Sequence, residues 1–213
     1  KHCKLCENLL EKGLIMTEFD DFYITPNGYP YHPYSSLIIN KSQSRSQRDP
    51  IRPEEIASQS KISILLGQYI FFNSIGAGAS IHDHQHFQMI DPEVLKINRK
   101  IIPLPILNDE LVKKEPVNNS PDVFRLKDYL VDALIFTGSE GPDKASQAAK
   151  MITGNDHGYN IIVNQDEIYV IGRKKSRERS ICMCRNVGGY EISGVALLGD
   201  IEEKSGEKNI SIN

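Results

Sequence analysis

Three of the six histidines in the chain stand at alternate positions, and a glutamine continues the alternation. His82, His84, His86 and Gln88 follow a glycine-rich stretch at 76–79. Because successive side chains of a β-strand point to opposite faces, this spacing predicts a strand over 80–90 with one polar row that begins at Ser80. Such a row must look into water or into a cleft, since burying unpaired polar groups costs free energy.

A cleft lined by imidazoles is suited to nucleophilic catalysis. Neutral imidazole is a nucleophile and a general base near pH 7, and neighbouring imidazoles lower one another's pKa because each opposes a second positive charge. A metal-binding face and a solvent-exposed edge are the two other interpretations. Glutamine is a poor ligand for transition metals, and a metal site does not need the preceding Gly-x-Gly-x-Ser. These two features favour catalysis.

The segment His84-Gln85-His86-Phe87-Gln88 resembles the His-x-His-x-Gln signature of the transferase branch of the histidine-triad superfamily. That branch includes galactose-1-phosphate uridylyltransferase, diadenosine tetraphosphate phosphorylase and GDP-L-galactose phosphorylase. A second register, 82–86, resembles the His-x-His-x-His of the hydrolase branch, whose intervening positions are usually apolar. Asp83 fits that register poorly, whereas Phe87 fits the transferase register. The resemblance therefore implies His86 as the nucleophile, with His84 as the alternative.

Other residues join the resemblance as candidate substrate ligands. Asn27 precedes a proline- and tyrosine-rich stretch that resembles the segment where the superfamily places an asparagine near the nucleotide sugar. Asn73, Gly78 and Ser80 match the Asn and Gly-x-Ser that contact the phosphates in the transferase branch. Ordinary turn chemistry is the alternative role for asparagine and glycine.

The stretch 159–175 resembles the late hairpin of the diadenosine tetraphosphate phosphorylases. It ends in a basic run that includes Arg173 and Lys175. Such a run is usually a solvated face. At the end of a strand returning to a catalytic sheet, the two cations could instead clamp a polyphosphate or a phosphorylated acceptor.

Cys3 and Cys6 are spaced so that two thiolates can share one Zn²⁺. In the uridylyltransferases and several histidine-triad proteins, such a pair is joined by the first histidine of the motif and another histidine, which implies His84 as the third ligand. The fourth ligand is left open among His2, His32 and a water. Two ordinary thiols are the alternative. No organic cofactor is expected.

The composition is that of an ordinary globular enzyme. The chain has 213 residues, 39% of them hydrophobic, and a formal net charge of −3, which gives no general attraction to nucleic acid. No apolar run approaches a membrane span, and no signal peptide opens the chain. Four cysteines in two close pairs indicate reduced thiols or metal ligands, so we expect a cytoplasmic protein.

The expected architecture is an α+β fold of the histidine-triad-like type, an antiparallel sheet flanked by helices. We expect one nucleotidyltransferase domain over 1–213, with an N-terminal Cys-x-x-Cys segment and a long irregular connection at about 91–122. Strands are expected at 21–25, 37–40, 68–73, 80–90, 159–163, 167–172 and 191–198, and helices at 53–66 and 143–152.

The residues and the resemblance together predict a nucleotidyltransferase or phosphorylase acting on a dinucleoside polyphosphate or a nucleotide sugar, with a phosphate-type acceptor. His86 would form a covalent nucleotidyl-histidine, and Gln88 would hold the phosphate. One alternative is a histidine-triad hydrolase of nucleotide phosphoramidates or dinucleotides that uses His84. The other is a non-catalytic, zinc-stabilised nucleotide-binding module. A homodimer is one assembly that the resemblance allows.

Overall fold

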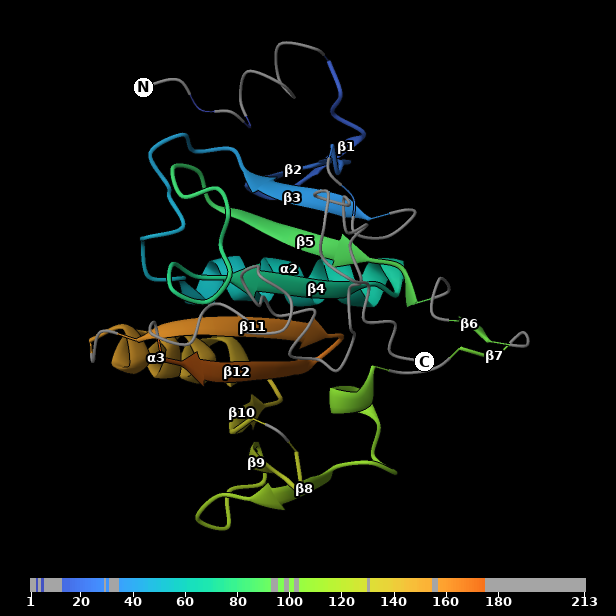
Figure 1. The fold of residues 1–213 in the computed structure, drawn as a ribbon, viewed down its shortest axis with the longest axis vertical. Helices are drawn as coiled ribbons and strands as arrows, with labels where there is room; N and C mark the ends of the chain where they lie inside the picture. The colour runs from blue at the N-terminus through green and yellow to red at the C-terminus, as the bar shows by residue number, and fades with distance from the viewer. Residues whose placement is uncertain are drawn as a thin grey trace, which may run out of the picture.

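The structure is a computed structural model that describes residues 3, 5, 13–28, 30, 35–92, 96–97, 100–101, 104–129, 131–154 and 157–174. Its centre is a ten-stranded sheet in which every pair of neighbouring strands is antiparallel. Two helices, α2 and α3, cover one face of this sheet (Figure 1). The expected α+β architecture is confirmed.

The strands of the large sheet are ordered β1-β2-β3-β5-β4-β11-β12-β10-β9-β8, so the histidine strand β5 lies between β3 and β4. A separate two-stranded sheet pairs β6 with β7. The strands are β1 Thr17–Phe19, β2 Phe22–Pro26, β3 Ser36–Asn40, β4 Tyr69–Asn73, β5 His86–Ile90, β6 Lys96–Ile97, β7 Lys100–Ile101, β8 Lys113–Pro116, β9 Val123–Lys127, β10 Ala133–Phe136, β11 Gly158–Asn164 and β12 Glu167–Arg173.

Helix α2 spans Pro53–Leu66 and α3 spans Gly141–Gly154, close to the two helices expected from the sequence. Proline at the first position of α2 lacks the N–H that would have no helical partner there, and the Glu55 side chain accepts a hydrogen bond from the Arg52 N–H at 2.8 Å. The helix ends at Gly67, whose φ of 65° is the left-handed conformation typical of a helix terminus.

The expected strand over 80–90 is wrong in its first half. Strand β5 begins at His86, and residues 80–85 form bends and open loop. This loop bonds to the segment 45–47 and to the last residue of β3. The Gln47 N–H donates to the His82 carbonyl, the Gln85 N–H donates to the Arg45 carbonyl, and the Asn40 N–H donates to the Gln85 carbonyl. The polar row therefore begins at His86.

The other expected strands up to residue 173 are confirmed, including the hairpin formed by β11 and β12. The sequence did not predict β1, β9 or β10. Within its described residues, the stretch 91–122 contains β6, β7, the 3₁₀ turn Pro105–Leu107 and β8. The strand expected at 191–198 lies outside the described residues.

The side chains of β5 separate the two faces of the sheet. Phe87 and Met89 pack under the helices in a large core that also contains Ile38, Ile70 and Phe72. His86 and Gln88 alternate with them and face the opposite side. On that side one apolar cluster is built around Phe71, Ile106, Ile162 and Tyr169, and a second consists of Leu5, Leu37 and Ile39 with Cys3 and Ile81 packed against it. The histidine motif lies between these two clusters.

Among the described residues, no helix combines the length and the apolar character needed to cross a bilayer.

A side chain at Gly158 would collide directly with the glycine-rich turn before the motif. A Cβ at this position would lie 2.6 Å from the Gly76 carbonyl carbon and 2.7 Å from its oxygen. We therefore predict that Gly158→Ala lowers the free energy of unfolding by about 1–3 kcal/mol in urea titration. Gly172→Ala is the matched control, because its Cβ would lie 3.7 Å from the nearest atom of Ile152, an ordinary contact. Equal stability of the two variants would contradict this packing.

Candidate active site

The imidazole of His86 is fixed by a hydrogen bond within its own motif. Its Nδ1 lies 3.0 Å from the carbonyl oxygen of His84. Because a carbonyl only accepts, Nδ1 must carry the proton, and in the neutral ring the lone pair is then on Nε2. His86 is only 7% exposed. The arrangement leaves the Nε2 lone pair in a defined orientation.

His84 is held by a different pair of atoms. Its Nε2–H donates to the carbonyl oxygen of Asn40 at 2.6 Å, which leaves the lone pair on Nδ1. That nitrogen lies 3.3 Å from the Sγ of Cys3. His84 is 2% exposed, so both of its ring nitrogens have partners inside the protein. The two histidines of the motif therefore have separate environments.

Burial lowers the pKa of both histidines below the usual value for the side chain. For His86 the cause is loss of solvation, supported by the nearby imidazole of His84 and opposed by the hydrogen bond to the His84 carbonyl. For His84 the loss of solvation again lowers the pKa, and the hydrogen bond to Asn40 opposes it. Both rings are consequently neutral at pH 7, the form in which His86 can attack.

The backbone of His86 is held by the side chain of Gln47. The Gln47 amide accepts from the His86 N–H at 2.9 Å and donates to the His86 carbonyl at 3.0 Å and to the Asn73 carbonyl at 2.9 Å. Gln47 is buried. One side chain therefore fixes the start of β5 and joins it to the end of β4.

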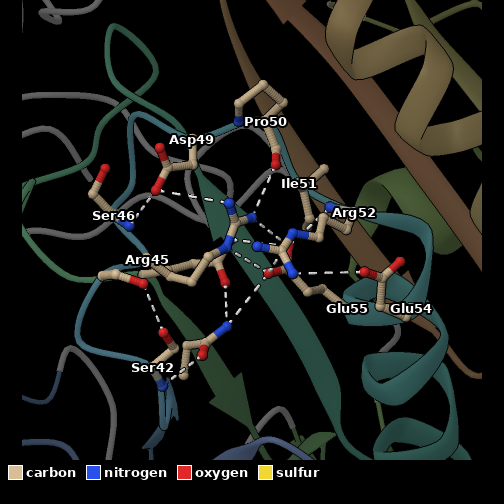
Figure 2. Close-up of polar contacts among 12 residues, drawn as sticks. Ser42, Arg45, Ser46, Asp49, Pro50, Ile51, Arg52, Glu54 and Glu55 are labelled. Carbon is tan, nitrogen blue, oxygen red and sulfur yellow. Dashed lines mark hydrogen bonds and ion pairs between the residues drawn. The ribbon is translucent and has the colours of Figure 1, made fainter.

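A buried ion pair lies behind the motif, on the side of helix α2 (Figure 2). The guanidinium of Arg45 makes two bonds of 2.8 Å to the carboxylate of Glu55. The same carboxylate accepts from the side chain of Gln85, the residue between the two motif histidines, at 3.1 Å. Asn40 donates to the Gln85 side chain from the other direction at 2.8 Å. These contacts tie the loop that carries His84 to helix α2 and strand β3.

On the other side of β5, two asparagines connect the sheet to the glycine-rich turn. Continuing the β4–β5 register places Asn73 opposite His86. Asn160 pairs with Asn73 and donates to its side-chain oxygen and to the Ala77 carbonyl, each at 2.7 Å. Arg173 donates to the Asn160 side chain at 3.1 Å. A cation is thereby held on the same side of the sheet as the motif.

The turn itself is shaped by glycine and by the first histidine. Gly76 and Gly78 have φ values of 81° and 94°, a region that other residues rarely adopt. The Nε2–H of His82 donates to the Ala79 carbonyl at 2.9 Å. His82, which has no role in the chemistry expected from the sequence, therefore closes the turn.

The structure brings most of the candidate residues together. His84, His86, Gln88, Asn73, Gly78 and Arg173 lie on β5 or on the turn and strands beside it. Ser80 is exposed on the loop between the turn and β5. Asn27 follows β2 one position beyond Pro26, which lies at the level of Met89, so it is beyond the Gln88 end of the motif. Lys175 and Cys6 lie outside the described residues.

The residues of this site that were not predicted from the sequence include Arg45, Gln47, Glu55 and Asn160. The first three occupy a polar stretch and a helix start whose composition is typical of a solvated surface. No local pattern reveals that they are buried. The only signal was the position of Glu55 in the first turn of a helix, which indicates a cap and not a core carboxylate.

The structure describes two of the three zinc ligands expected from the sequence, Cys3 and His84, so the distance between them can be compared with that in a zinc site. Two ligands of one tetrahedral Zn²⁺, a thiolate and an imidazole nitrogen, lie about 3.5 Å apart. The Cys3 Sγ to His84 Nδ1 distance of 3.3 Å is close to that value, and Nδ1 carries the lone pair. The described residues contain no group of three metal-ligating side chains, and Cys6 is not among them. The Cys3–His84 pair fits one half of a zinc site.

Comparisons with solved structures identify the fold. Yeast Ap4A phosphorylase Apa2 in complex with AMP matches with a TM-score of 0.61 and 18% identity, over 86% of this chain and 68% of that one. Apa2 in complex with Ap4A matches with a TM-score of 0.61 and 18% identity, over 85% and 66% of the two chains. The chain therefore has the histidine-triad-like fold and spans about two thirds of Apa2. No family model matches the sequence, and no curated protein matches it.

The buried neutral histidines predict a specific dependence of stability on pH. In the unfolded chain a histidine has its ordinary pKa of about 6.5, whereas His86 in the folded protein binds a proton only at lower pH. The free energy of unfolding should therefore be fully present above the unfolded pKa of about 6.5. It should fall as the pH decreases from there toward the lower folded pKa, by at most about 1.4 kcal/mol per pH unit for each group.

The measurement is urea unfolding at pH 7.5 and at pH 5.5, in the wild type and in His86→Gln. The loss of stability between the two pH values should be smaller in the variant, because one linked proton has been removed. An equal loss in both proteins would contradict a depressed pKa at His86.

Proposed function

We propose that this protein is a nucleotidyltransferase of the phosphorylase type that acts on a dinucleoside polyphosphate through a nucleotidyl intermediate on His86. The observation that carries the proposal is the hydrogen bond from His86 Nδ1 to the His84 carbonyl, which leaves the Nε2 lone pair available. The likeness to Apa2, a phosphorylase of Ap4A, supports the choice of a dinucleoside polyphosphate over a nucleotide sugar.

The reaction is a double displacement at an α-phosphorus. The lone pair of His86 Nε2 forms a bond to phosphorus, and the bond from phosphorus to the bridging oxygen breaks, so that the rest of the substrate leaves with that oxygen. An oxygen of a phosphate-type acceptor then attacks the same phosphorus. The phosphorus–nitrogen bond breaks, and its electron pair returns to Nε2 while the new nucleotide departs.

The neighbouring groups would position the phosphate and stabilise its charge. Gln88 lies on the same face of β5 as His86, and its amide would donate to a non-bridging oxygen. The backbone of the turn at Gly78, the Ser80 hydroxyl and the Asn73 amide would add donors, and Arg173 would neutralise negative charge. Asn27 would contact the nucleotide sugar, and Lys175 would extend the cationic side.

The third position of the motif favours transfer over hydrolysis. An imidazolium at this position could protonate the leaving group and assist the attack of water, whereas the amide of Gln88 holds the phosphate without supplying a proton. A phosphate-type acceptor can then compete with water for the intermediate.

The hydrolase alternative assigns the attack to His84. In this structure both ring nitrogens of His84 are occupied, Nε2 by the Asn40 carbonyl and Nδ1 by the contact with Cys3. His84 is thus suited to holding the motif in place or binding a metal ion, and His86 remains the better nucleophile.

Zinc is a structural part of the proposal. Cys3, Cys6 and His84 would hold the ion through two thiolates and Nδ1, and the ion would join the N-terminal segment to the motif. It would supply no chemistry to the transfer. The second alternative function is a zinc-stabilised module that binds nucleotides without turnover. Homodimerisation and a cytoplasmic location remain predictions.

The covalent intermediate can be tested directly. Incubation with a dinucleoside tetraphosphate labelled at the α-phosphorus, without acceptor, should leave label on the wild-type protein. His86→Gly should abolish the adduct, because the other lone pair of the motif, on His84 Nδ1, is in contact with Cys3 Sγ and does not face the substrate in this proposal. His157→Gln is the matched control, a histidine outside the motif, and should keep the label. Acid-labile label on the denatured protein is the measurement.

Three results would overturn the proposed function. An adduct that survives in His86→Gly and disappears in His84→Ala would place the nucleophile at His84. Turnover that is equally fast with and without phosphate would indicate a hydrolase, since a phosphorylase needs the acceptor. Binding of nucleotides with neither adduct nor turnover would favour the non-catalytic module.

The zinc proposal predicts one Zn²⁺ per chain by elemental analysis of protein purified without chelator. Cys3→Ser and Cys6→Ser should each lower the zinc content, because removing one thiolate from a four-ligand site weakens binding. Cys182→Ser is the control and should retain the metal. Zinc absent from the wild type, or retained in both N-terminal variants, would contradict this site.

A further inference from the structure

Glu55 is an unusual residue for the first turn of a helix, because its carboxylate is buried and saturated with donors. It is 5% exposed. It accepts two bonds of 2.8 Å from Arg45, one of 2.8 Å from the Arg52 N–H and one of 3.1 Å from Gln85. An N-terminal helix position would need only the bond to Arg52. The remaining bonds hold residues that come from outside the helix.

The bond to Gln85 connects Glu55 to the motif. Gln85 stands between His84 and His86, and its side chain is clamped between Glu55 and Asn40. Its backbone is clamped as well, since its N–H donates to the Arg45 carbonyl at 2.9 Å and its carbonyl accepts from the Asn40 N–H at 3.1 Å. Gln85 is completely buried. Every polar group of this residue is therefore fixed.

The peptide bond between His84 and Gln85 links the position of Gln85 to the direction of the His84 carbonyl. A trans peptide is planar, and its N–H and C=O point in opposite directions. The N–H of this peptide is fixed on the Arg45 carbonyl, so the C=O of His84 must point the other way, toward His86 Nδ1. The placement of Arg45 thus determines where the acceptor for His86 lies.

Arg45 is itself placed by Glu55. Its guanidinium is buried, bonded twice to the Glu55 carboxylate and once to the Pro50 carbonyl at 3.0 Å (Figure 2). Removing the carboxylate would leave the buried cation with only the half-exposed Asp49 carboxylate, 3.7 Å from the guanidinium, as counter-charge, and Arg45 would move toward Asp49 and solvent. The backbone of Arg45 would move with it.

We propose that Glu55 is a positioning residue for the nucleophile: through Arg45 and Gln85 it orients the His84 carbonyl, which in turn holds the proton of His86 on Nδ1. Glu55 itself contacts neither substrate nor the reacting atoms. The proposal rests on the assignment of His86 as the nucleophile.

The ion pair is accessible from the side of the sheet away from His86. A cavity of about 860 Å³ is lined by Asn40, Arg45, Glu55 and residues of α2 and of the β1–β2 turn. A small carboxylate can therefore enter from solvent and replace a missing Glu55 side chain beside Arg45. Such chemical rescue would restore the orientation without touching the substrate site.

The principal variant is Glu55→Ala, with Glu54→Ala as its matched control. Glu54 is the preceding residue of the same helix, and its side chain is 65% exposed. We expect Glu55→Ala to slow adduct formation in a single turnover by up to about 100-fold, because a misplacement of about 1 Å at a reacting group can cost that much. Nucleotide affinity should be unchanged. Formate should restore the rate, and Glu54→Ala should behave as the wild type.

A second variant keeps the test valid if Glu55→Ala does not fold. Arg45→Met/Glu55→Leu replaces the pair by apolar side chains of similar volume, which buried ion pairs often tolerate. This protein should fold but react slowly, and formate should not rescue it because the cation is absent. A wild-type rate in this folded double variant would overturn the proposal.

An activity-independent readout separates this proposal from the proposed function. In ¹⁵N-histidine-labelled protein, the nitrogen shifts of His86 report which ring nitrogen carries the proton. We expect the Nδ1–H form in the wild type and a mixture of forms in Glu55→Ala. Failure of the wild type to form any adduct would refute the function alone. An unchanged His86 spectrum in folded Glu55→Ala would refute the positioning role.

Discussion

The hydrogen bond from His86 Nδ1 to the His84 carbonyl is the contact around which the rest of the site is arranged. It joins the last turn of a loop to the first residue of a strand, a distance of two residues along the chain. Because Nδ1 donates, Nε2 is left with a lone pair, and because the ring is buried, it stays neutral. Orientation and protonation state thus follow from one contact and its surroundings.

That contact depends on a network of buried polar side chains. Leaving any of them without a hydrogen-bond partner would cost free energy. Asn40, Arg45, Gln47, Glu55 and Gln85 are all buried, and each one has hydrogen-bond partners within 3.1 Å. Fully hydrogen-bonded networks of this kind favour one arrangement of their side chains. If one member is removed, its partners stay buried without a hydrogen bond, which costs free energy. The carboxylate of Glu55 is central here, since it bonds to both Arg45 and Gln85.

The sequence predicted those elements that are marked by alternating polar and apolar residues or by residues typical of helix starts and turns. Pro53 with its two following glutamates marks the start of α2, and the two-residue turn after Asn164 marks the hairpin of β11 and β12. Alternation also identified His86 and Gln88, which do share a face of β5. It failed at His82 and His84, because the glycines at 76 and 78 and the bonds to segment 45–47 hold residues 80–85 out of the sheet.

The network behind the motif could not be predicted because its members are far apart in the sequence. Glu55 lies ten residues from Arg45 and thirty from Gln85, and the three meet only when α2 packs beside the end of β3. Arg45, Gln47 and Asn40 belong to residue types that are mostly exposed, so composition indicates a surface loop. Tertiary packing alone makes them part of the interior.

The most direct test of the account is the identity of the atom that carries phosphorus in the covalent intermediate. Nuclear magnetic resonance of ¹⁵N-histidine-labelled protein, trapped with nucleotide in the absence of acceptor, distinguishes the two ring nitrogens and the individual histidines. We expect phosphorus on Nε2 of His86. Phosphorus on Nδ1 of His86, or on His84, would contradict it.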